Sequence, residues 1–292
     1  SAIVVVIIAA ILEQSISYVF KLIIDSVESG NYEDALFYGL SFPVALFVIQ
    51  CSFRVSGILG MRWTNNVRKD GYDYLFGHIL KHSHSYFSDR FAGSIHNKIR
   101  NVVEGVDNLI PEILWTYINS IVSFLVTFVF ILTVDVLAAV VFLLLVVALL
   151  YANKKLAPKK QKYAYEHAEA SSKMHAGMID TISNISATRQ YTREEQEKER
   201  IAKMTHAHYL SGMASWGRTE FMLFINGIIL FIFSFAMFYI LVERWKLGSV
   251  TTGEFVLVAS LISQMSGTLI FIGRAFNSTA RTMGEMKEGF DE

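Results

Sequence analysis

The sequence predicts an all-α membrane protein in which six transmembrane helices extend into the cytoplasm. The chain is 53% hydrophobic and only 18% charged over 292 residues, whereas soluble proteins are about 45–50% apolar. Its apolar residues gather in charge-poor blocks that approach the roughly 20 residues a helix needs to cross a bilayer. Only three prolines interrupt the chain, which favours helices over architectures with many turns.

The six predicted spans follow the apolar blocks in order. Glu13, Gln14 and Lys21 interrupt the first block. The apolar run from Ile113 to Tyr151 is too long for one span, and Thr133–Asp135 is a natural tight turn between two. We expect the spans at residues 2–25, 35–58, 110–132, 136–153, 221–242 and 252–275.

The polar intervals between the spans differ in length and charge. The intervals at residues 54–109 and 152–220 hold 8 and 12 Lys and Arg residues, whereas the three short intervals together hold 2. Basic intervals face the cytoplasm, so we expect both ends of the segment there, in a bacterial inner membrane. Structureless loops of this length are rare, so we expect helical extensions that reverse at tips near residues 82–93 and 180–191.

Several classes of function have no support in the sequence. The net charge is zero, which gives no basis for a nucleic-acid partner. His78 and His82 stand four residues apart, but two histidines do not complete a zinc site, so we expect no metal. No catalytic residue is predicted, because Cys51 is the only cysteine and lies in an apolar block.

Polar and small residues within the predicted spans are the candidates for a cargo cavity. They could line a pathway, or they could mark close contacts between helices, which also use small and polar residues. For Glu13 a further alternative is a position near the membrane interface. The candidates are Glu13, Gln14, Asn226, Ser260, Ser263, Gln264 and Gly267.

Two motifs lie at the predicted tips. The first is Tyr86-Phe87-Ser88-Asp89, followed by Gly93 and the run 95–100, and the second is the stretch 178–191. Together with the spans and the long intervals, they make the whole chain resemble the transmembrane domain of ABC exporters of the type I (also called type IV) fold. The family patterns are FFD…G-x-L-x-x-R and E-x-x-x-G-I-x-T-V-(K/R)-A-F. This chain departs from the second pattern at Asp180, Asn184 and the pair Ala187-Thr188.

The resemblance implies that the two tips are coupling helices, which rest on cytoplasmic nucleotide-binding domains. It also implies a second transmembrane half, identical or different, and a cargo pathway that opens alternately to the two sides. The tip residues that it implicates are Tyr86, Phe87, Asp89, Gly93, Asp180, Asn184, Ile185 and Thr188.

The segment itself contains no G-x-x-x-x-G-K-[ST] motif, so we expect it to bind no cofactor. ATP and Mg²⁺ are implied for a nucleotide-binding domain, in the same chain after residue 292 or in a separate chain. The full-length protein or complex would then be an ABC-type ATPase. The alternative is a protein without ATP dependence: a membrane receptor or scaffold, or an ion-coupled channel or transporter.

Overall fold

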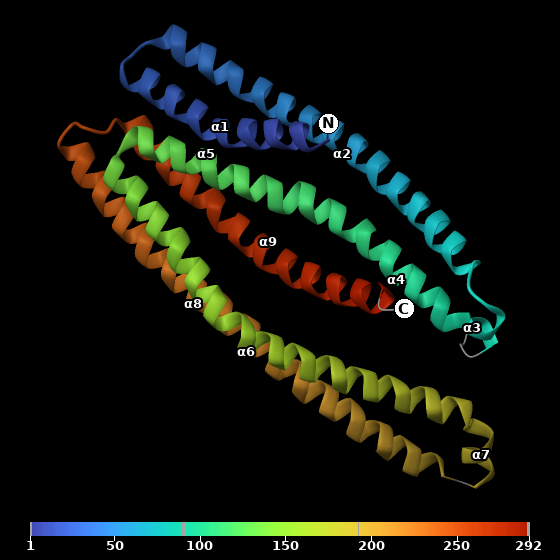
Figure 1. Cartoon of the computed structure of the whole chain (residues 1–292). Coiled ribbons are helices and arrows are strands. Elements are labelled where there is room, and N and C mark those ends of the chain that lie inside the picture. The colour runs from blue at the N-terminus through green and yellow to red at the C-terminus, as the bar shows by residue number, and fades with distance from the viewer. Residues whose placement is uncertain (1, 89–91, 192, 291–292) are drawn as a thin grey trace. The chain divides into compact units, whose positions relative to one another are not determined.

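The computed structural model describes residues 2–88, 92–191 and 193–290, and in these ranges it is almost entirely helical with no strand (Figure 1). The all-α prediction is therefore confirmed. The elements are α1 (Ala2–Glu28), α2 (Tyr32–Ile79), α3 (His84–Ser88), α4 (Ala92–Pro111), the π-helix η1 (Glu112–Ile118), α5 (Asn119–Val134), α6 (Val136–Ser183), α7 (Ile185–Gln190), α8 (Glu194–Lys246) and α9 (Thr252–Phe290).

Within the described residues, five helical segments are long and apolar enough to cross a membrane. They are α1, α2, the continuous segment Ile95–Val134, α6 and α8. In α9 the apolar stretch Thr252–Met265 is shorter, so the sixth span remains a prediction. The helices α2, α6 and α8 have 48, 48 and 53 residues. At 1.5 Å per residue they are about 70–80 Å long, more than twice the thickness of the hydrocarbon core.

The chain divides into two compact units. The first contains the residues up to Val140 and those from Met237 onward, and the second runs from Val141 to Ala236. In the first unit α1 packs against α2, α5 and α9. Ala9 and Ala10 of α1 are fully buried, and such small side chains let neighbouring helices approach closely. The second unit is an antiparallel pair formed by α6 and α8, with α7 between them (Figure 1).

Two of the long helices bury little of their apolar surface within the chain. In the most apolar 18-residue stretch of α2, only 6% of the residues are buried. The same fraction is buried in the corresponding stretch of α8. Phe47 of α2 and Phe231 of α8 are examples of side chains that stay about 70% and 69% exposed. These surfaces are therefore available to lipid or to helices of another chain.

An acidic residue of α1 caps the start of α9. The Asp25 carboxylate accepts a hydrogen bond from the Gly253 amide at 3.0 Å, and Lys21 forms an ion pair with Glu254 at 2.9 Å. The first amides of a helix have no partner within the helix, so Asp25 supplies an acceptor that α9 lacks. The two contacts fix the end of α1 against the beginning of α9.

Asp135 performs a similar role at the turn between α5 and α6. Its backbone is extended, and one carboxylate oxygen accepts from the Ala138 amide at 2.9 Å. The other oxygen lies 3.0 Å from Nε of Arg244 at the end of α8. The predicted turn between two helices is therefore present, and a single aspartate both caps α6 and pairs with α8.

Replacement of Gly253 by alanine should destabilise the contact between α1 and α9. A Cβ at this position would lie 2.5 Å from the Lys21 carbonyl oxygen and would also clash with the Asp25 carboxylate. We expect a loss of about 1–3 kcal/mol, seen as a lower melting temperature in detergent or lipid. Gly39→Ala in α2 is the matched control, because no atom lies within 4 Å of its added Cβ. Equal melting temperatures for the two variants would show that the close contact of Gly253 with α1 does not stabilise the protein.

Candidate functional site

The second predicted tip is a short helix held between two long ones. Helix α6 ends at Ser183, α7 occupies Ile185–Gln190, and α8 begins at Glu194. Asn184 leaves the helical conformation with φ −103° and ψ 21°. Its amide still donates to the Asp180 carbonyl at 3.1 Å, and its own carbonyl accepts from the Thr188 amide at 3.0 Å. The chain therefore changes direction without leaving these backbone groups unpaired.

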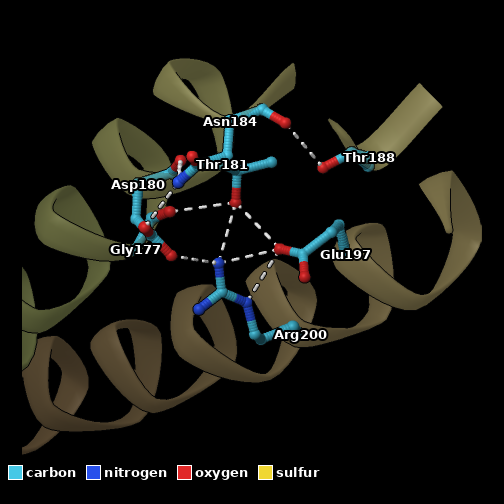
Figure 2. Close-up of polar contacts among 7 residues, drawn as sticks. All are labelled: Gly177, Asp180, Thr181, Asn184, Thr188, Glu197 and Arg200. Carbon is cyan, nitrogen blue, oxygen red and sulfur yellow. Dashed lines mark hydrogen bonds and ion pairs between the residues drawn. The ribbon is translucent and has the colours of Figure 1, made fainter. Parts of the chain in front are cut away.

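Arg200 of α8 joins the beginning of α8 to the end of α6 (Figure 2). Its Nη2 lies 2.7 Å from Oε2 of Glu197 and 3.1 Å from Oδ2 of Asp180. The same nitrogen donates to the Thr181 hydroxyl at 3.0 Å, and Nε donates to Glu197 at 2.9 Å. The planar guanidinium thus holds two carboxylates and a hydroxyl from two helices in one arrangement.

Thr181 and Asn184 extend this network toward α7. The Thr181 hydroxyl can donate to the Gly177 carbonyl at 3.0 Å or to Glu197 at 2.9 Å. The side-chain amide of Asn184 donates to Oδ1 of Asp180 at 3.1 Å, the carboxylate oxygen that Arg200 leaves free. Thr188 of α7 donates to the Asn184 carbonyl at 3.2 Å. Polar contacts therefore run without a break from α8 through α6 and the turn to α7 (Figure 2).

The network is electrostatically favourable although it is open to water. Side-chain exposures are 38% for Arg200, 29% for Glu197 and 59% for Asp180. Hydrogen bonds to Glu197, and then to Asp180, raise the pKa of Arg200 above its ordinary value. Arg200 therefore remains a cation, and it offsets the repulsion between two carboxylates that would otherwise lie close together.

Several apolar side chains of the tip are exposed. Ile179 and Ile182 at the end of α6 are 65% and 70% exposed. Ile185 of α7 is 40% exposed, and Tyr191 after α7 is 75% exposed. Exposed apolar residues gathered on a polar helical extension are typical of a surface that contacts another protein.

The first predicted tip contains the short helix α3. The Tyr86 ring stacks on His82 at 4.3 Å and meets Phe87 edge-on at 5.4 Å between centroids. Phe87 is 40% exposed. Gly93 belongs to α4, and Asp89 lies outside the described residues. The His78 ring meets His82 edge-on, with 5.3 Å between the ring centroids. No group of three or more metal-binding side chains is found in the described part of the chain.

The cargo-cavity candidates fall into different environments. Gln14 is buried and bridges two turns of α5, donating to Ser123 at 3.2 Å and accepting from Thr127 at 3.4 Å. Gln264 of α9 donates to Ser17 of α1 at 2.7 Å. Both glutamines therefore contact neighbouring helices, through residues that the sequence analysis did not single out.

The other cargo-cavity candidates lie in different surroundings from the two glutamines. Asn226 of α8 forms a reciprocal pair with Asn153 of α6, in which each amide donates to the other at 3.2 Å. Ser260 donates to its own helix at the Leu257 carbonyl. Ser263 and Gly267 are exposed, and Glu13 is half-buried. Their role in a cavity remains a prediction.

No pattern in the sequence predicts the π-helix η1. Glu112 in its first turn accepts a hydrogen bond from Thr279 of α9. Because the Thr279 proton goes to Glu112, Tyr117 donates to the Thr279 oxygen at 2.8 Å. The wider turn of a π-helix changes the register of the following residues. Glu112 and Tyr117 of η1 both bind Thr279 of α9.

Arg200→Gln should loosen the second tip. The neutral amide cannot hold both carboxylates, so Asp180 and Glu197 repel each other and Asn184 loses its fixed partner. We expect backbone hydrogen exchange across residues 181–191 to become severalfold faster in the full-length protein. Lys203→Gln is the matched control, because Lys203 is exposed on the same helix and makes no ion pair among the described residues. Unchanged exchange in Arg200→Gln would show that the network does not order α7.

Known proteins share the sequence pattern and the fold of this chain. A family model described as "ABC transporter transmembrane region" matches residues 1–269. No curated protein matches the chain. Among the solved structures 218 chains match. One is described as "Structure of a bacterial Atm1-family ABC exporter with ATP bound", with a TM-score of 0.79 and 17% sequence identity. The match covers 99% of this chain and 52% of that one, so this chain spans about half the length of the solved exporter.

Proposed function

Because the chain belongs to the family of ABC transporter transmembrane regions, we propose that it is the membrane-spanning half of an ATP-driven exporter. It is an integral, multi-pass membrane protein with the fold of an exporter transmembrane domain. A second transmembrane half completes the cargo pathway. ATP and Mg²⁺ bind to nucleotide-binding domains, in the same chain or in a partner. Both ends of the segment lie in the cytoplasm, and the membrane is a bacterial inner membrane.

The polar network at the second tip is the observation that carries this proposal. A helix of six residues would change orientation freely if it were joined to its neighbours only by flexible turns. Thr188 of α7 instead binds Asn184, and Asn184 binds Asp180 of α6. Asp180 pairs with Arg200 of α8, so polar contacts connect α7 to both long helices. A force applied to α7 by a nucleotide-binding domain therefore passes to α6 and α8 together. Stiff helices that extend beyond the membrane turn such a force into a rigid-body movement of the spans.

The exposed apolar surfaces of α2 and α8 support the proposal that a second transmembrane half completes the assembly. Within a single chain only 6% of the residues in the most apolar stretch of each helix are buried. Two halves placed around one pathway would cover part of these surfaces and leave the remainder to lipid. The exposed residues Ser263 and Gly267 of α9 would then be open to the pathway.

Cross-linking tests whether the tips contact a nucleotide-binding domain. Ile185→Cys and Phe87→Cys, each in a Cys51→Ser background, should form a disulfide or maleimide link to a cysteine placed on that domain in the full-length protein. Tyr209→Cys is the control, because it is 58% exposed but lies 15 residues into α8. Products from Tyr209→Cys alone, or from none of the three in any nucleotide state, would argue against coupling through the tips.

Alternating access predicts a change in labelling at α9. Ser263→Cys in the Cys51→Ser background should react with a water-soluble maleimide at rates that differ severalfold between the nucleotide-free and the ATP–vanadate states. Val44→Cys on α2 is the control, because lipid would cover this exposed side chain in both states. Changing the P-loop lysine of the nucleotide-binding domain should abolish ATP hydrolysis and the difference at Ser263. A labelling rate independent of nucleotide would favour a protein without ATP dependence.

A further inference from the structure

Lysine residues are concentrated where α6 leaves its apolar segment. Five of them fall within nine residues, and residues 136–165 contain no Asp or Glu. The apolar stretch from Val136 to about Asn153 is roughly 27 Å long, which nearly spans the hydrocarbon core. The lysines therefore begin at the level of the lipid headgroups. They are Lys154, Lys155, Lys159, Lys160 and Lys162.

Four of these lysines share one face of α6, and this face points away from α8. At about 100° per residue, Lys154, Lys155, Lys159 and Lys162 fall within an arc of about 140°. All four are exposed. Next to these lysines, the residues of α6 that bind side chains of α8 lie on the other side of the helix. They are Asn153 bound to Asn226, Tyr163 bound to Arg218 and His167 bound to Ser211. We call the four-lysine surface the lysine face.

Most of the positive charge on the lysine face is not neutralised by the chain. Among the described residues, Lys154, Lys155 and Lys159 form no ion pair, and Lys162 is 3.8 Å from Glu166. Elsewhere in the same unit lysines do have close acidic partners, as with Lys173 and Glu169 at 2.7 Å. Three adjacent cations without an anion raise the local positive potential, which an external anion can lower.

The geometry directs these cations toward the membrane. Side chains of an α-helix lean toward its N-terminus, and the N-terminal part of α6 is the membrane-spanning part. The long lysine stems can also reach back along the helix and keep the ammonium group at the headgroup level. Tyr151 lies at the membrane side of the face, and the Lys155 ammonium is 4.9 Å from its ring centroid. Tyrosines in this position are typical of the lipid–water interface.

We propose that the lysine face binds the headgroups of anionic phospholipids at the membrane surface where α6 leaves its apolar segment. The ammonium groups of Lys154, Lys155 and Lys159 each offer three hydrogen-bond donors and no acceptor, which suits the oxygens of a phosphodiester. A zwitterionic headgroup carries its own cation and gains less at this surface. The site needs neither ATP nor a nucleotide-binding domain, so it does not depend on the proposed transport function.

The expected affinity follows from the number of unpaired lysines. Each lysine near an anionic membrane surface favours binding by about fivefold, so loss of three should weaken it by tenfold or more. The attraction should fall with salt, because charges in water are screened over about 8 Å at physiological ionic strength.

Native mass spectrometry of the full-length protein with added lipid tests the proposal. The probes are palmitoyl-oleoyl phosphatidylglycerol and, for comparison, palmitoyl-oleoyl phosphatidylcholine. The test variant replaces Lys154, Lys155 and Lys159 by glutamine. The matched control replaces Lys173, Lys198 and Lys203 by glutamine, which removes the same charge about 25 Å or more from the apolar segments. A variant with arginine at the three test positions keeps the charge and guards against a folding defect.

The expected result is selective retention of phosphatidylglycerol by the wild type, the arginine variant and the control, with at least tenfold weaker retention by the test variant. Several results would overturn the proposal. These are equal retention of both lipids, equal retention by the test and control variants, and loss of retention in the arginine variant. Competition by soluble glycerophosphoglycerol at the same concentration as the lipid would assign a free phosphodiester instead. Unchanged lipid binding with capture of an acidic partner protein would assign the face to that protein.

Discussion

A polar group inside a bilayer has no water to bind, so it needs a hydrogen-bond partner within the protein. This requirement governs how the chain is built. Backbone amides and carbonyls satisfy it by forming helices, because a helix pairs these groups within one segment. The ends of the helices need partners from elsewhere. At the short connections Asp25 supplies an acceptor to α9, and Asp135 supplies one to α6. One constraint thus explains both the helical composition and the position of two aspartates.

Polar side chains within the spans also need partners, and they find them on neighbouring helices. Gln14 meets Ser123 and Thr127, and Asn153 meets Asn226. Interhelical hydrogen bonds of this kind contribute about 0.6–2 kcal/mol each in membranes, so their number matters less than their specificity. A reciprocal pair of asparagines can form in only one register of α6 against α8. Polar residues in the spans therefore fix how the helices align, whether or not some of them also face a pathway.

The helical class and the location of the turns could be predicted because they depend on local properties of the chain. Charge-free runs, the aspartate after Thr133 and the break at Asn184 can each be recognised within a few residues. Partners that are distant in sequence could not be predicted. Arg200 stands in a run of charged residues that does not point to any one partner, and its contact with Asp180 depends on the reversal between α6 and α8. The partner of Asn226 lies 73 residues away. The π-helix also had no local signal, since its sequence fits an ordinary helix.

Outside the membrane the constraint is relaxed, and the contacts have a different character. At the second tip Arg200, Asp180 and Glu197 are all accessible to water, where single ion pairs contribute little to stability. Several such contacts in series can still define one orientation of α7, because each restricts a different rotation of the turn. An arrangement of this kind is firm enough to transmit a force and weak enough to rearrange during a cycle. A buried apolar tip would resist that rearrangement, and it would also lack the exposed Ile185 and Tyr191 that a partner could contact. The polar tip therefore fits the proposed role of α7 as a coupling element.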